Sequence, residues 1–337
     1  MLAAFVAVGA VAAQDPKVER RRVVWLGEGR DPVPAEACLA MALPAPSPSA
    51  DLAPGQRSVV GAAVLPARLD LFPGCVVGKT KVAGGSHGVL LERTADGWAL
   101  VLVGAEALTA SDPVAALLAS APVAQLPLRR VGAGEGKFVT FRFVVQEQGQ
   151  KDDVARLVLS FGGEAYEVAL QFPGMKDPPF VPEGLRHASV LWDGDRVVGV
   201  LDHGDVAWND ERKAEMGQLG RTARWRLGAN WWTSFDVRAP IELGGQKLPA
   251  GRFHLVLVRG KSADDWQLAC LPVAETLKAG LDAVSAALTK GGALVPLALQ
   301  TKQPLAGKLR IAFEGAPDAR LVIAFGDAVL TAAVRVP

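Results

Sequence analysis

The sequence predicts an all-β protein built as two tandem antiparallel β-sandwich domains, each with one peripheral helix. Three observations lead to this prediction: an internal repeat, apolar residues that alternate with polar ones, and glycine turns between the alternating segments. The repeat is clearest where residues 155–162 read Ala-Arg-Leu-Val-Leu-Ser-Phe-Gly and residues 319–326 read Ala-Arg-Leu-Val-Ile-Ala-Phe-Gly, identical at six of eight positions. Such an internal repeat indicates that one domain-sized unit occurs twice in the chain.

Further anchors extend the repeat over most of the chain. They are Trp25 with Trp192, Trp98 with Trp266, and Pro127 with Pro296, at offsets of 167, 168 and 169. The offset falls to 164 near the end because a polar insert at 146–153 lengthens the first unit. Residues 173–182 contain four prolines, which disfavour helix and central strand and therefore predict a linker. The expected domains are a degenerate first unit over residues 15–172 and a second unit over residues 183–337.

Alternation places strands at matching positions in the two units. Apolar residues alternate over 157–161, a glycine pair turns the chain, and alternation resumes over 166–170. Residues 321–325 and 330–334 repeat this hairpin, and residues 253–257 with 266–271 predict another. Apolar residues at helical spacing predict one helix over 274–290, with a weaker counterpart at 114–119 in the first unit.

Composition narrows the classes of function. Half of the residues are hydrophobic, 21% are charged and the net charge is +1, which allows a sizeable core and predicts no nucleic-acid partner. Residues 2–13 form an apolar run with small residues at its end, which predicts a signal peptide over residues 1–14 and a periplasmic or secreted location. No later segment is long and apolar enough to predict an integral membrane span.

Cysteine and histidine usage predicts neither a metal site nor a cofactor. Cys38, Cys75 and Cys270 stand apart with no Cys-x-x-Cys pair, a spacing that excludes a zinc ribbon or a haem attachment site. Buried thiols and a Cys38–Cys75 disulfide both remain open. The four histidines form no dense ligand set.

Three ordered motifs in the second unit carry a family resemblance. They are Trp225-Arg226 followed by Gly228-Ala229-Asn230, a turn reading Gly245-Gln246-Lys247-Leu248-Pro249-Ala250-Gly251, and Asp264-Asp265-Trp266 at the start of a strand. This succession, over roughly residues 201–336, resembles the bacterial family called domain of unknown function 2911. The resemblance implies an exported β-sandwich protein and implies no reaction.

The two units differ at the residues that could contact a ligand. At the common offset of 167, the first unit keeps the Gly-Ala pair but has serine, valine and alanine in place of Trp225, Arg226 and Asn230. This asymmetry favours a site for a small molecule or glycan around Trp225, Arg226, Asn230 and Trp232, because exposed tryptophans can stack on sugar rings. The alternative is that the tryptophans belong to the core, and that Arg226 and Asn230 satisfy buried backbone groups.

Asp202, His203 and Asp205 place one histidine beside two carboxylates. Such a set could act as acid and base, or could be a solvated turn, and no nucleophile elbow accompanies it. The leading hypothesis is therefore a non-enzymatic ligand- or glycan-binding module. The alternatives are a hydrolase-like enzyme that uses these three residues, and a purely structural scaffold in which the two units pack together.

Overall fold

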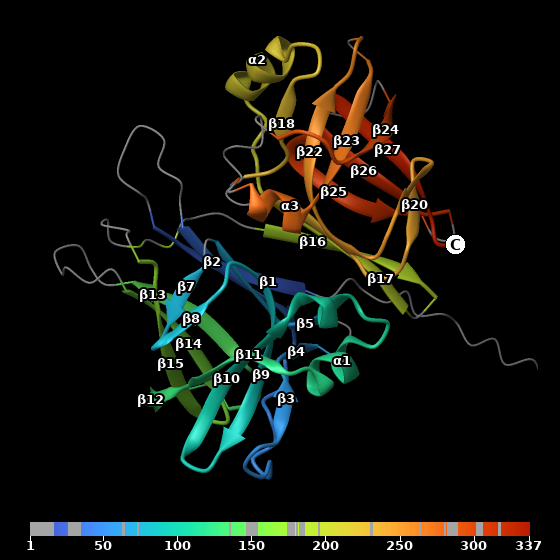
Figure 1. Ribbon diagram of the computed structural model, residues 1–337. Coiled ribbons are helices and arrows are strands. Elements are labelled where there is room, and N and C mark those ends of the chain that lie inside the picture. The colour runs from blue at the N-terminus through green and yellow to red at the C-terminus, as the bar shows by residue number, and fades with distance from the viewer. Residues whose placement is uncertain are drawn as a thin grey trace, which may run out of the picture.

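The computed structural model of the protein describes residues 17–25, 35–62, 65–72, 74–134, 136–145, 154–173, 179, 181, 186–194, 196–229, 232–262, 264–279, 281, 289–300, 306–315 and 318–337. These residues form mostly antiparallel strands with a few short helices, which confirms the predicted all-β class (Figure 1). The expected signal peptide over 1–14 lies outside the described residues, as does most of the expected linker at 173–182.

The N-terminal half, residues 17–173, forms two large antiparallel sheets and a two-stranded sheet of β4 and β5. Its strands are β1 (Lys17–Trp25), β2 (Ala35–Leu43), β3 (Arg57–Val59), β4 (Gly61–Ala62), β5 (Leu65–Pro66), β6 (Arg68–Phe72), β7 (Cys75–Val77), β8 (Thr80–Val82), β9 (Gly85–Thr94), β10 (Gly97–Gly104), β11 (Pro122–Pro127), β12 (Arg129–Ala133), β13 (Thr140–Val145), β14 (Val154–Phe161) and β15 (Glu164–Gln171). The first sheet has the order β1-β2-β6-β9-β10-β11, and β3 also pairs with β9. The second has the order β13-β14-β15-β7-β8, and β12 also pairs with β15.

The C-terminal half, residues 186–337, forms one continuous 12-stranded sheet, and the first part of that sheet repeats the first sheet of the N-terminal half. Its strands are β16 (Arg186–Asp193), β17 (Arg196–Gly204), β18 (Arg224–Arg226), β19 (Thr233–Val237), β20 (Ile241–Leu243), β21 (Gln246–Leu248), β22 (Gly251–Arg259), β23 (Trp266–Pro272), β24 (Ala293–Gln300), β25 (Ala306–Glu314), β26 (Arg320–Gly326) and β27 (Ala328–Arg335). The order β16-β17-β19-β22-β23-β24 continues through β27 to β20 and β21, while β18 pairs with β22 and β25 with β26.

The strand registers of the two halves agree in detail. Ser58 on β3 lies opposite a leucine of β9, and Trp225 on β18 lies opposite a leucine of β22. Gly61 and Gly228 follow these strands with φ angles of 97° and 90°, which glycine adopts without steric cost. The Gly-Ala pair shared by the two sequences therefore occupies the same bend in both halves.

Each half contains a core between two facing layers of strands. Leu91 of β9 packs in the same cluster as Leu157 of β14, and Leu257 of β22 packs in the same cluster as Ile323 of β26. This is the layered arrangement of a β-sandwich. The predicted hairpins are confirmed as β14–β15, β26–β27 and β22–β23.

Within the described residues, four short helical segments accompany the strands. They are a 3-10 helix η1 (Ala105–Thr109), α1 (Pro113–Ala119), α2 (Asp210–Gln218) and α3 (Val273–Lys278). α1 and α3 coincide with the expected helices at 114–119 and at the start of 274–290, although residues 282–288 lie outside the described set. α2 adds a helix to the C-terminal half that the sequence pattern did not predict. Within the described chain, none of the helices has the length and apolar character required to cross a membrane.

All three cysteines are buried thiols, so the Cys38–Cys75 disulfide left open by the sequence is not formed. Strand alternation supplies the reason. Cys75 lies in the core of the N-terminal half with Leu39 of β2, whereas Cys38 is the neighbour of Leu39 and points to the opposite face of that strand.

The two halves lie against each other (Figure 1). Apolar side chains pack between them. Phe72 of β6 shares a buried cluster with Trp232 and Val256 of the C-terminal half. Leu65 of β5 shares another with Val200 of β17. The intramolecular contact left open by the sequence is therefore present in the described structure, and β6 and β19 lie near its centre.

Candidate functional site

Trp225 belongs largely to the core of the C-terminal half. Its side chain is only 7% exposed and stacks on Phe325 with a centroid separation of 5.4 Å. Its indole Nε1 donates a hydrogen bond to Glu215 Oε1 of α2 at 2.9 Å, which ties this polar helix to β18. Stacking on Phe325 and burial leave Trp225 without an open ring face for a sugar.

Trp232 lies in a different environment from Trp225. It is 1% exposed, and its ring stacks on His254 at 4.6 Å in the apolar cluster between the two halves. Its carbonyl oxygen accepts a hydrogen bond from Arg186 Nη2 at 2.9 Å. Asn230 lies outside the described residues. Of the four expected ligand residues, the structure therefore brings Trp225 and Arg226 to one cavity and places Trp232 elsewhere.

Asp202, His203 and Asp205 do not converge on one point. Asp202 and His203 are neighbours on β17, so their side chains point to opposite faces of the sheet. Asp202 is 1% exposed and forms a buried ion pair with Arg186, with Nε 3.2 Å from both carboxylate oxygens. Asp205 accepts hydrogen bonds from His187 Nε2 at 3.0 Å and Lys308 Nζ at 2.8 Å.

His203 is held as a neutral side chain inside the sandwich. Burial lowers its pKa to about 4, despite the opposing effects of the Gly204 carbonyl and Asp202. The Ile311 backbone N–H donates to Nε2 at 3.2 Å, so Nδ1 carries the proton and faces the Gly204 carbonyl at 3.3 Å. The His203 ring is 2% exposed and is held between two backbone groups. This environment is typical of a structural histidine.

A cavity of about 390 Å³ opens between β18 and α2, and we call it the arginine cavity. It is lined by Val206, Arg212, Glu215, Leu219, Arg224, Trp225, Arg226 and Gly228. The Asn209 side chain accepts from the Arg212 N–H at 2.9 Å and so caps α2, which supplies Arg212 and Glu215. Strand alternation on β18 brings Arg224 and Arg226 to the same side of that strand.

Three arginines and one carboxylate are found among the described residues that line the arginine cavity. Glu215 accepts from Arg212 Nη1 through one oxygen and from Trp225 Nε1 through the other. Arg224 instead donates to neutral acceptors, the Thr289 hydroxyl at 3.2 Å and the Gly291 carbonyl at 3.0 Å. Burial lowers the pKa of Arg224, as expected for a cation removed from water without a carboxylate beside it.

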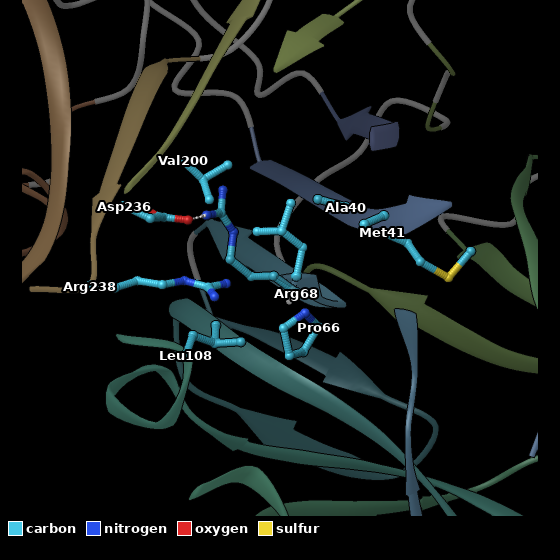
Figure 2. A pocket seen from close by; sticks show the side chains of 10 residues that line it. Ala40, Met41, Pro66, Arg68, Leu108, Val200, Asp236 and Arg238 are labelled. Atoms are coloured by element: carbon cyan, nitrogen blue, oxygen red, sulfur yellow. Dashed lines mark hydrogen bonds and ion pairs between the residues drawn. The ribbon is translucent and has the colours of Figure 1, made fainter. Parts of the chain in front are cut away.

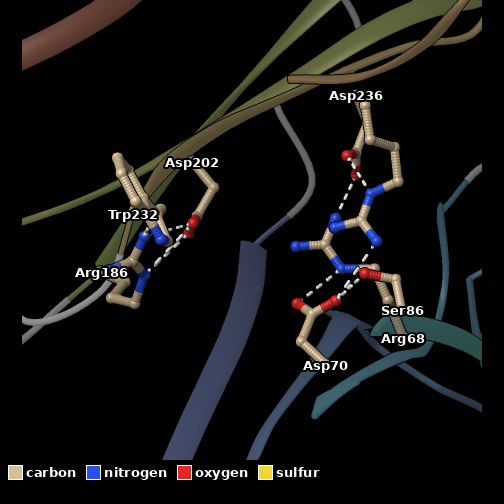
Figure 3. Close-up of polar contacts among 8 residues, drawn as sticks. Arg68, Asp70, Ser86, Arg186, Asp202, Trp232 and Asp236 are labelled. Atoms are coloured by element: carbon tan, nitrogen blue, oxygen red, sulfur yellow. Dashed lines mark hydrogen bonds and ion pairs between the residues drawn. The ribbon is translucent and has the colours of Figure 1, made fainter. Parts of the chain in front are cut away.

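A ring of four charged side chains, two of them buried and two partly buried, joins the two halves (Figure 3). Arg68 Nε contacts Asp70 at 2.9 Å and its Nη1 pairs with Asp236, while Arg252 contacts Asp236 at 2.7 Å and Asp70 at 3.3 Å. We call these four residues the ion ring. Burial alone would lower the Arg68 pKa, but the charges of Asp236 and Asp70 raise it well above its usual value.

The sequence contains one signal for the ion ring, an aspartate that recurs at equivalent positions of the repeat. The motifs and alternation considered above did not lead to its prediction. Asp70 lies opposite Ser86 between β6 and β9, and Asp236 lies opposite Arg252 between β19 and β22. The two aspartates therefore occupy equivalent positions in the repeat. An aspartate recurring inside an apolar strand is unusual unless its charge is paired, and that recurrence could have identified both residues.

A cavity of about 40 Å³ lies beside the ion ring (Figure 2). Arg68, Asp236 and Arg238 line it together with apolar residues that include Val200 and Pro66. A water molecule needs roughly 10–15 Å³ by this measure, so the space suits a few waters and excludes an organic ligand. The described residues contain no group of three His, Cys, Asp or Glu side chains arranged to hold a metal ion.

Comparison with known proteins supports the family resemblance and does not assign a reaction. Residues 207–325 match the model of a family described as "Protein of unknown function (DUF2911)". This match confirms the resemblance predicted for the C-terminal region, and it includes α2, β18 and the arginine cavity. No curated protein and no solved structure showed significant similarity to the chain.

Proposed function

We propose that this protein is a non-enzymatic binding module that holds a small anionic ligand in the arginine cavity. The observation that carries the proposal is the surplus of guanidinium groups. Arg212, Arg224 and Arg226 line a cavity in which Glu215 is the one lining carboxylate, and both oxygens of that carboxylate already accept hydrogen bonds. Among the described lining residues, three guanidinium groups therefore accompany one carboxylate, and an anionic ligand suits such a lining.

The chemistry of arginine suits this role. A guanidinium group presents a planar fork of donors that matches a carboxylate or phosphate in a bidentate arrangement. Contacts with Thr289 and Gly291 hold Arg224 in place, so less side-chain entropy is lost when a ligand binds. The cavity volume of about 390 Å³ lies within the range of small-molecule sites, roughly 300–1,000 Å³.

The geometry favours an acidic ligand over a neutral sugar. Recognition of a neutral sugar would use an open aromatic face, and the Trp225 ring is stacked on Phe325 and buried. A glycan bound at this site would therefore carry a carboxylate, as a uronic acid does, and the arginines would recognise that group.

We test the proposal by isothermal titration of the full chain with galacturonate and its neutral counterpart galactose. Galacturonate is expected to bind and galactose is expected to bind at least tenfold more weakly, because only the acid carries a carboxylate that guanidinium groups can bind. Inorganic phosphate tests the same guanidinium chemistry without a sugar ring. Saturation at a hundredfold excess over Kd would stabilise the folded state by about 2.7 kcal/mol, a second readout from the melting temperature.

Two variants with the same change of charge locate the binding. Arg226→Gln removes a guanidinium from the cavity and is expected to reduce galacturonate affinity at least tenfold. Arg221→Gln removes an exposed cation nearby in the sequence and is expected to leave the affinity unchanged. Equal binding of galactose and galacturonate, or equal loss in both variants, would contradict recognition at the arginine cavity.

Export and domain organisation belong to the same proposal. The apolar run over residues 2–13 supports removal of residues 1–14 and a periplasmic or secreted location, and the prolines of 173–182 support a boundary between domains at 15–172 and 183–337. Expression of the full chain in a Gram-negative host, followed by fractionation and N-terminal sequencing, is expected to give an extracytoplasmic protein that starts near residue 15. A cytoplasmic product that retains residues 1–14 would argue against export.

A further inference from the structure

A second cavity, of about 460 Å³, lies between the two halves, and we call it the cleft. Glu106 and Thr109 of η1 line it from the N-terminal half. Pro249, Ala250 and Phe253 line it from the C-terminal half, where the Leu-Pro-Ala-Gly turn leads into β22. The cleft has the volume of a small-molecule site, and neither half could form it alone.

The walls of the cleft are mainly apolar. Pro272, Val273 and Ala274, at the junction of β23 and α3, continue the surface begun by Pro249 and Ala250. These side chains have no polar atoms, so their contact with a ligand is driven by removal of apolar surface from water. The body of a ligand that fits the cleft is therefore apolar.

Among the described residues that line the cleft, two carry a charge, Arg252 and Glu106, and only the first is in an ion pair. The Arg252 guanidinium is balanced within the ion ring by Asp236 at 2.7 Å and Asp70 at 3.3 Å. Glu106 is exposed at the cleft, and among the described residues no basic side chain forms an ion pair with its carboxylate. The cleft thus combines an apolar wall with one uncompensated negative charge.

We propose that the cleft binds an organic cation, a small molecule with an apolar body and an ammonium group. The apolar body packs against Phe253 and Val273, and the ammonium group pairs with Glu106. A carboxylate next to an apolar wall discriminates by charge, since a neutral molecule gains only the apolar contact and an anion is repelled. This site is independent of the arginine cavity, which attracts the opposite charge.

The test uses three probes of similar shape and different charge, titrated into the full chain by calorimetry. They are 2-phenylethylamine, 2-phenylethanol and 3-phenylpropionate. We expect the amine to bind at least tenfold more tightly than the alcohol, and the carboxylate to bind most weakly at the cleft. No binding of the amine at millimolar concentration, or equal affinity for amine and alcohol, would overturn the proposal.

Variants assign the binding to the cleft. Glu106→Gln keeps the shape of the side chain and is expected to reduce amine affinity at least tenfold while leaving the alcohol unchanged. Glu242→Gln makes the same change on β20, outside the cleft, and should alter neither affinity. Ala250→Leu, at an exposed turn, narrows the cleft and should weaken both probes. Amine binding unaffected by Glu106→Gln and Ala250→Leu would overturn the proposal, and loss in Arg226→Gln would assign the amine to the other cavity.

Discussion

Replacing Asp236 by alanine is expected to lower the free energy of unfolding by about 3–5 kcal/mol, the usual cost of removing one partner from a buried ion pair. Asp236 accepts from both arginines of the ion ring, and those two side chains are only 5% and 8% exposed. Without Asp236, Arg68 and Arg252 would share Asp70 alone, and two buried guanidinium groups would lie near each other with one charge uncompensated. Urea denaturation followed by tryptophan fluorescence measures this loss.

An exposed ion pair provides the control for this prediction. Arg196 and Asp193 are about half exposed, and Asp193→Ala is expected to cost less than about 1 kcal/mol. A second comparison separates charge from packing. The double variant Arg68→Met with Asp236→Leu removes opposite charges together, and it should be less destabilising than the sum of its single variants. A cost for Asp236→Ala no larger than that for Asp193→Ala would show that the ion ring contributes little to stability.

Acidification from pH 6.5 to pH 4 is expected to destabilise the protein by about 3 kcal/mol through His203 alone. Burial lowers the pKa of His203 to about 4 and that of His254 to about 3, so both rings are neutral in the folded protein at pH 6. In the unfolded chain each would titrate near its ordinary value of 6.5. The unfolded state therefore binds more protons over this window, and stability rises with pH and falls as protons are added.

The measurement is the free energy of unfolding in urea at half-unit steps between pH 7.5 and pH 4. His203→Gln removes a titrating group while the amide retains a donor and an acceptor for the Gly204 carbonyl and the Ile311 N–H. Its pH slope below 6.5 should be smaller than that of the parent by up to about 1.4 kcal/mol per pH unit. His254→Gln should reduce the slope in the same direction. A slope unchanged in both variants would contradict neutral buried histidines as the origin of the acid sensitivity.

The sandwich strands could be predicted because their signals are local. The alternation over 157–161 and 321–325 indicates which face of each strand is buried, and the glycine turns determine where the hairpins form.

Helix α2 could not be predicted in the same way. Its sequence Asp-Glu-Arg-Lys-Ala-Glu-Met-Gly-Gln is polar on all sides and buries no residue, so no apolar stripe marks it. Capping by Asn209 and the contact from Trp225 to Glu215 hold it in place.

The candidate site was predictable only in part. Trp225 and Arg226, which the first unit lacks, both line the arginine cavity, and their role in ligand binding stays a prediction. Whether the ring face of Trp225 is open to a ligand depends on how far the ring is buried. That burial depends on Phe325, which is a hundred residues away in the sequence. The ion ring depends on pairs separated by 168 and 182 residues, and no local pattern contains that information.

The ion ring also has a consequence for how such chains can diverge. Its aspartates occupy equivalent positions in the repeat, but its arginines do not: Arg68 lies on β6 and Arg252 on β22, and serines stand at the corresponding places, Ser234 and Ser86. A substitution in one half therefore changes which residues are tolerated in the other. Among descendants of a common ancestor, positions 68, 70, 236 and 252 should be inherited as a coupled set, although more than 160 positions separate the two pairs.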